Sequence, residues 1–133
     1  MTATPLPIPL KTFSEFKTQM QCGIIDTPVI IFEPDQYLNE LGNIIYYTSC
    51  ITSINICNTS NIDIVVSCYI IDGSETNNNL NVFYILKDFS LQAGMNTFLK
   101  PELFLSENHK VMLHSDSKSF TCDSIISYQV LIQ

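Results

Sequence analysis

The stretch SINICNTSNIDIVVSCYIID, residues 53–72, contains two apolar runs separated by Asn-Thr-Ser-Asn. Apolar residues occupy every second position of the second run, which is the period of a strand with one buried face. The residues on that face are Ile62, Ile64, Val66, Cys68 and Ile70. The first run alternates in the same way over 51–57, and the residues between the runs favour a turn. The stretch therefore predicts a β-hairpin, with two strands joined around Cys57–Asn61.

Strand patterns continue to the end of the chain. The last strand again places alternate residues on one face, namely Cys122, Ser124, Ile126, Tyr128, Val130 and Ile132. Ala93-Gly94 marks a turn, and Pro101 divides NTFLKPELFL into two short pieces at an edge or a corner. Because no strong amphipathic helix separates these strands, the pattern predicts an all-β, antiparallel β-sandwich of jelly-roll or Ig-like type, with about seven or eight strands.

The first third of the sequence differs from the rest. Pro5, Pro7 and Pro9 fix alternate φ angles, which predicts an extended arm over residues 1–12. Short helical turns are expected within 12–23 and 34–42, where apolar residues recur at helical spacing and a glycine follows. We therefore expect an arm and an irregular, partly helical lead-in over 1–43, followed by a β-sandwich domain over 44–133.

The charge composition limits the classes of partner. The net charge is −7, and the cations are six lysines without any arginine. Proteins that grip nucleic acid directly concentrate positive charge and rely on arginine, so direct nucleic-acid binding is disfavoured. No apolar run approaches the roughly 20 residues of a membrane-spanning helix, and no basic secretion signal opens the chain. We expect neither nucleic acid nor membrane as a partner.

Reactive residues do not form a recognisable catalytic pattern. His109 and His114 lie five apart on one predicted strand, which places them on opposite faces and too far apart to chelate one metal ion. Cys57, Cys68 and Cys122 lie in apolar strand interiors, where burial leaves a thiol inert. The acidic residues are dispersed. We therefore predict a non-enzymatic protein without catalytic, cofactor-binding or metal-binding residues.

Two polar segments allow further readings. The loop over 72–79 is rich in oxygen ligands and could bind calcium, although a simple loop between strands fits its spacing better. Asn58-Thr59-Ser60 matches the glycosylation sequon, but without an export signal this match predicts no modification.

Tyrosine and phenylalanine are abundant, and they predict either core or interface residues. The second face of the strand over 61–71 carries Tyr69 and Ile71, which would leave apolar area exposed on a lone molecule. We therefore predict an interface formed by the arm and this strand face. Its residues are Pro5, Pro7, Pro9, Tyr69, Ile71 and Tyr84.

Three segments together resemble a class of small β-sandwich virion proteins of tailed bacteriophages, especially marine and cyanobacterial phages. The segments are ITSINICNTSNIDIVVSCYIID, VFYILKDFSLQAGMNTFLKPELFLSENHKVMLHS and CDSIISYQVL, and the resemblance covers 44–133. It implies a non-enzymatic structural component of the virion, attached to tail, neck or capsid and assembled in the host cytoplasm. The implied partners are other virion proteins and copies of the chain itself.

Two other functions stay open. A carbohydrate- or receptor-binding module, such as a fibre tip or a lectin-like sandwich, would use exposed tyrosines and the loop over 72–79. A small hydrolase would require a convergent catalytic set, which the sequence does not reveal.

Overall fold

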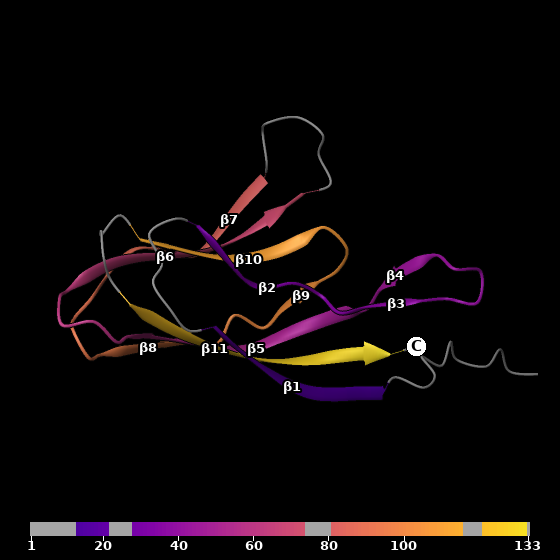
Figure 1. Ribbon diagram of the computed structural model, residues 1–133, viewed down its shortest axis with the longest axis horizontal. Helices are drawn as coiled ribbons and strands as arrows, with labels where there is room; N and C mark the ends of the chain where they lie inside the picture. Colours follow the sequence, from indigo (N-terminus) through magenta and orange to yellow (C-terminus); the bar gives the residue numbers. More distant parts are fainter. Residues whose placement is uncertain (1–12, 22–27, 74–80, 116–120, 133) are drawn as a thin grey trace, which may run out of the picture.

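The computed structural model describes residues 13–21, 28–73, 81–115 and 121–132, with 13–21 and 132 described by their backbone only. Eleven strands and no helix occur in these residues (Figure 1). The strands are β1 Phe13–Gln21, β2 Val29–Phe32, β3 Gln36–Leu38, β4 Ile44–Tyr46, β5 Thr48–Asn58, β6 Ile64–Asp72, β7 Asn81–Leu91, β8 Asn96–Leu99, β9 Leu103–Leu105, β10 His109–Ser115 and β11 Cys122–Ile132.

Nine strands form two sheets, and the other two form a separate hairpin. The first sheet has the order β1-β11-β5-β8, with β9 pairing the same strand β5 beyond β8. The second sheet has the order β2-β10-β6-β7. The β3–β4 hairpin extends from one end of the sandwich along its long axis (Figure 1). All strand pairs are antiparallel.

The strand pairs are nested along the chain. The innermost pair is β6–β7, then β5 pairs β8 and β9, then β2 pairs β10, and β1 pairs β11 outermost. A long hairpin rolled into two facing sheets is the jelly-roll arrangement. The predicted antiparallel β-sandwich is therefore confirmed, in its jelly-roll form. The strand count exceeds eight because β3 and β4 are an insertion and because Pro101 divides the partner of β5 into β8 and β9.

The hairpin predicted around Cys57–Asn61 is wrong. The strands β5 and β6 do form on either side of it, but β5 belongs to the first sheet and β6 to the second. The connection over 59–63 therefore crosses between the sheets instead of turning back within one. Both strands direct their apolar faces into the space between the sheets, and they do so from opposite sides of it.

The helical turns predicted within 12–23 and 34–42 are also wrong. The segment over 13–21 is strand β1, which pairs with β11 along its whole length, and this pairing overrides a weak helical pattern. The second segment is strand β3 followed by a tight turn. The two sheets thus include β1 and β2, which precede residue 44. The expected arm over 1–12 lies outside the described residues.

The core lies between the sheets and follows the predicted alternation. Alternate residues of β5, β6, β10 and β11 are almost fully buried. In β11 they are Cys122, Ser124, Ile126, Tyr128 and Val130, as the sequence predicts. The rings of Phe32 on β2 and Tyr128 meet edge to face, 4.6 Å apart, and so join the two sheets.

Candidate interaction surface

Four titratable side chains, those of Glu33, Tyr46, His109 and Lys110, line a depression of about 190 Å³. No group of three or more His, Cys, Asp or Glu side chains that could hold a metal ion occurs in the described residues. The backbone N–H of Ser106 donates to Nδ1 of His109 over 3.0 Å, and Nε2 lies 3.9 Å from a carboxylate oxygen of Asp72. His114 lies five residues further along β10, opposite Ser67 of β6. The described part of the chain contains no helix long and apolar enough to cross a membrane.

The cysteines differ in their burial. Cys68 and Cys122 are fully buried, and burial raises the pKa of each thiol to about 12. Their predicted inertness agrees with this environment. Cys57 was predicted to be buried too, but it lies on the outer side of β5 and is partly exposed. Cys50 is also partly exposed, and its pKa is raised by burial and by the negative charge of Glu102.

Asn58 is a structural residue at the end of β5. It is fully buried, and its side-chain amide donates to the carbonyl oxygens of Ile62 and Leu91, at 2.7 and 3.1 Å. A buried amide that already donates twice cannot present itself to a glycosyl transferase. The sequon match at 58–60 is therefore a structural motif, and it stabilises the crossing between the two sheets.

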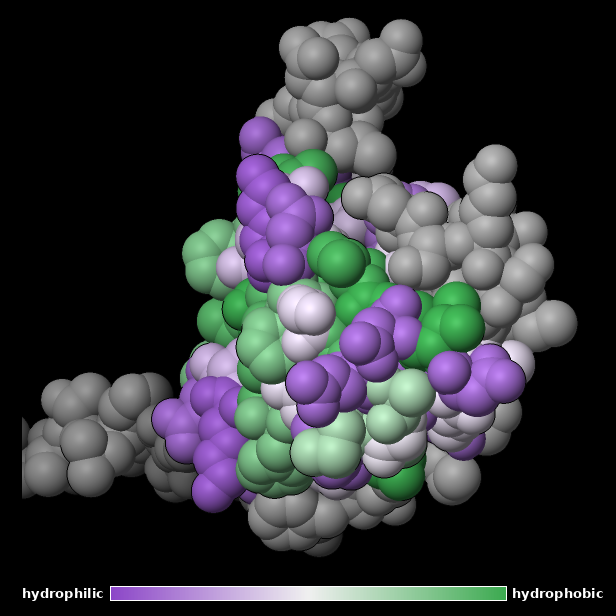
Figure 2. Space-filling model, turned by 90° about the vertical axis from the view of Figure 1, so that its left-hand side faces the viewer, coloured by the Kyte–Doolittle hydropathy of each residue, from purple (hydrophilic) through white to green (hydrophobic). Residues whose placement is uncertain are grey.

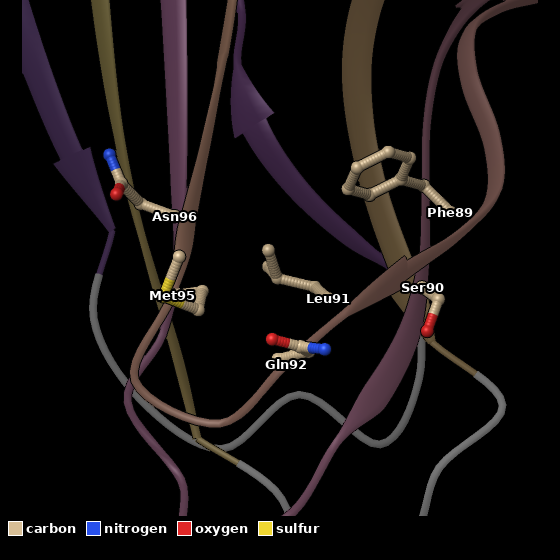
Figure 3. A pocket seen from close by; sticks show the side chains of 6 residues that line it. All are labelled: Phe89, Ser90, Leu91, Gln92, Met95 and Asn96. Atoms are coloured by element: carbon tan, nitrogen blue, oxygen red, sulfur yellow. The ribbon is translucent and has the colours of Figure 1, made fainter.

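A shallow depression lies where β7 passes into β8, at the end of the sandwich opposite the β3–β4 hairpin (Figure 1). It measures about 320 Å³, and its uncharged lining is Phe89, Ser90, Leu91, Gln92, Met95 and Asn96. Leu91 lies between Phe89 and Met95 in Figure 3, and its side chain is buried between the sheets. Apolar residues gather at the centre of this end of the molecule (Figure 2). The depression offers apolar contact but no reactive group.

The residues predicted for the strand-face interface lie together in the second sheet. Tyr69 on β6 stands opposite Tyr84 on β7, with ring centroids 5.4 Å apart, and Ile71 stands opposite Val82. Nζ of Lys87 lies 4.9 Å from the centre of the Tyr84 ring. Partial burial, with smaller contributions from Tyr84 and Cys68, raises the pKa of Tyr69. Pro5, Pro7 and Pro9, the arm residues of the same prediction, lie outside the described residues.

The β3–β4 hairpin was not predicted from the sequence. The Asn39 side chain accepts hydrogen bonds from the backbone N–H groups of Leu41 and Asn43, both at 2.9 Å, and so builds the turn. Gly42 adopts a positive φ of 82°, which glycine tolerates without strain. Leu41 at the tip is 85% exposed. Apolar residues that alternate around Asn39-Glu40-Leu41-Gly42 could have indicated this hairpin.

The outer face of the first sheet carries two further exposed aromatic residues. Phe98 on β8 stands in register with Asn55 on β5, whose other neighbour is Ile125 on β11. Phe104 on β9 stands in register with Cys50. Both phenylalanines are well exposed, and neither was predicted as an interface residue. Apolar contact area is thus distributed over several faces of the jelly roll.

Comparisons with known proteins find a similar fold in chains of viral particles. No protein-family model matches the sequence, and no curated protein matches it. The crystal structure of the T13 particle of infectious bursal disease virus contains a similar chain, with a TM-score of 0.51 and 10% identity. This similarity covers 100% of the present chain and 36% of the viral one.

A structure of the Gx strain of the same virus gives a TM-score of 0.50 at 8% identity, over 98% of this chain and 37% of that one. The present chain therefore spans little more than a third of the length of the chains it resembles. At these identities the likeness concerns the fold alone. Neither neighbour is a tailed-phage protein, so the predicted phage type has no support from these structures.

Proposed function

We propose that this protein is a non-enzymatic structural subunit of a virus particle, which packs against copies of itself and against other virion proteins. The observation that carries the proposal is the jelly-roll strand order, combined with exposed apolar residues on more than one face. The similarity in fold between the whole of this chain and 36% of a chain of a viral particle supports the same class.

The exposed surface has the composition of a contact surface. Aromatic and large aliphatic side chains are enriched at the centres of protein interfaces, where charged residues are depleted. Phe83, Phe98, Phe104 and Leu41 are all exposed here. A net charge of −7 makes copies of the chain repel one another at long range, so close contact is favoured where the surface carries no charge.

A finer proposal follows from the resemblance of 44–133 to virion proteins of tailed bacteriophages. In this proposal the subunit is attached to tail, neck or capsid, and it is assembled in the host cytoplasm. The arm residues Pro5, Pro7 and Pro9 contact a neighbour, since proline loses little entropy on binding. The face formed by Tyr69, Ile71 and Tyr84 makes a second contact.

The test begins with particles of the virus that encodes the chain, purified through two successive density gradients. Quantitative mass spectrometry should find the chain in a fixed ratio to the major particle protein in both gradients. A chain abundant in infected cells but lost from the particle fraction would refute the structural role. Deletion of residues 1–12 should leave a folded protein that no longer enters particles, and normal incorporation would refute the role of the arm.

A carbohydrate-binding function is kept as the alternative, because Tyr84 is exposed beside Tyr69 and aromatic faces bind sugars through stacking. Screening the full chain on a glycan array tests it. Absence of binding at millimolar sugar would dismiss the alternative and leave the structural role unaffected.

A further inference from the structure

We infer that two copies of this chain pair through the start of β7, residues 81–84, which extends the second sheet across a two-fold axis. The inference rests on the proposed function, because it names the surface through which copies of the subunit meet. It concerns a hydrogen-bonded strand edge, which differs from the side-chain interface already proposed.

The strand β7 lies at an open edge. Within the described residues it pairs with β6 alone. The backbone groups on its other side therefore form an edge that can accept a further strand. Val82, Phe83 and Tyr84 are 46, 60 and 45% exposed. Since successive residues point to opposite faces of a sheet, apolar side chains are exposed on both faces here.

The other edges of the two sheets carry features that residues 81–84 of β7 lack. Strand β1 contains one acidic and one basic residue, and β2 lies between Pro28 and Pro34. The edge formed by β8 and β9 is interrupted by Pro101 and by Glu102, whose φ is +49°. Charged residues, prolines and irregular backbone are the usual devices against edge-to-edge pairing. The β7 segment Asn-Val-Phe-Tyr-Ile-Leu contains no proline, glycine or charge.

The pairing surface has a defined end. Asp88 has a positive φ of 49°, and the register between β6 and β7 shifts close to it. The backbone N–H of Asp88 donates to Oγ of Ser67 over 3.0 Å, which fixes this irregularity. A second register shift leaves Ile85 without a partner on β6. Because bulges bend and twist a strand, regular pairing stops at Tyr84. A regular edge of four residues, about 13 Å long, is left.

A second copy is the occupant that this edge favours. In an antiparallel pair about a two-fold axis, the segment over 82–84 faces itself, so apolar side chains lie beside apolar side chains. No charge of one copy meets a like charge of the other within this segment. Elsewhere a net charge of −7 opposes association, which concentrates favourable contact at the uncharged edge.

Sedimentation velocity of the full chain over a wide concentration range tests the inference. The wild-type protein should form dimers, and Phe83→Lys should weaken the association at least about tenfold, because the substitution occurs twice in each dimer. Phe104→Lys is the matched control, since Phe104 is 64% exposed and lies on the edge strand β9 of the other sheet. The Phe104→Lys variant should dimerise with the same affinity as the wild type. Val82→Lys, on the opposite face of β7, should repeat the effect of Phe83→Lys.

Hydrogen exchange then identifies the kind of contact. The amides within 81–84 that point away from β6 should become at least tenfold more protected as the dimer forms, while those of 103–105 should not change. A wild-type monomer at all concentrations, or a dimer unaffected by both lysine variants, would overturn the β7 pairing. Neither result affects the presence of the chain in purified particles, which tests the proposed function separately.

Discussion

Replacement of Asn58 by alanine tests how the two sheets are held together. The Asn58 side chain donates to the carbonyl oxygens of Ile62, in the connection that crosses between the sheets, and of Leu91, at the end of β7. Its Oδ1 accepts the backbone N–H of Ser60 over 3.0 Å. One fully buried amide thus joins β5, the crossing connection and the turn before β8.

The expected loss of stability can be worked out from these bonds. The bond to Leu91 is buried, and leaving that carbonyl without a donor costs about 1–3 kcal/mol. The bonds to Ile62 and Ser60 are partly buried, so water can replace some of their energy, and each contributes about 0.5–1 kcal/mol. Asn58→Ala should therefore lower the free energy of unfolding by about 2–5 kcal/mol.

Urea denaturation followed by far-UV circular dichroism and tyrosine fluorescence measures the loss, since the chain has six tyrosines and no tryptophan. Asn55→Ala is the matched control. Asn55 lies on the same strand, and its Oδ1 accepts an exposed hydrogen bond from Asn96 over 3.0 Å. Asn55→Ala should lower the free energy of unfolding by less than about 1 kcal/mol. Equal losses in the two variants would refute the role of the buried amide.

Asn58→Asp adds a pH test of the same site. The new carboxyl group would face two carbonyl oxygens without solvent, so its folded-state pKa should lie well above the value of about 3.9 in the unfolded chain. Between those pKa values the folded state holds one more proton, and the free energy of unfolding falls as the pH rises, by about 1.4 kcal/mol per pH unit. Measured against the wild type between pH 5.5 and 7.5, the variant should lose stability with rising pH. A flat difference would contradict a buried, neutral carboxyl group.

Substitutions at three further residues test individual features of the fold. Ser49→Ala should change the unfolding free energy by less than about 1 kcal/mol or raise it, since the buried Oγ of Ser49 has no hydrogen-bond partner among the described residues; a larger loss in urea denaturation would reveal a missing partner. Asn108 has a φ of +69°, a left-handed conformation that glycine adopts more readily than alanine. Asn108→Gly should therefore leave the free energy of unfolding unchanged, while Asn108→Ala should lower it by about 1–2 kcal/mol. Equal shifts in melting temperature for the two variants would contradict this backbone strain. Burial raises the pKa of the Cys68 and Cys122 thiols to about 12, against about 9 in the unfolded chain. Because the folded state keeps these protons to a higher pH than the unfolded state, the free energy of unfolding should fall from about pH 9 upward. Cys68→Ala should reduce the steepness of that fall, and an unchanged slope would contradict the assignment.

Local alternation in the sequence predicted the faces of individual strands. In β6 and β11 the inward residues are those at every second position, because one side of each strand meets the other sheet. The pattern could not identify the neighbours of a strand. Residues 59–63 are long enough either to turn back or to cross between sheets, and the choice depends on β10 and β11, far along the chain. The partner of β1 is more distant still, and its pairing overrode the weak helical signal.

The candidate surface was predicted in part. Alternation on β6 placed Tyr69 and Ile71 on its outer face, and the register with β7 brings Tyr84 beside Tyr69. Exposure of Phe98 and Phe104 depends on which residues of β8 and β9 face outward, and this follows from their pairing with β5. Sequence alone left those faces undetermined, since each strand is too short to show a clear period.

The error in the hairpin prediction also concealed the edge at β7. Had β5 and β6 been neighbours in one sheet, the apolar segment over 82–86 would have been expected to lie within a larger sheet and to face the core. Crossing between the sheets instead gives β6 the neighbours β10 and β7, and β7 becomes the last strand of its sheet. The same uncharged residues that indicated an ordinary buried strand are then exposed on both faces. Since natural proteins protect such edges, an unprotected one in a jelly roll is explained most simply by a strand that covers it after assembly.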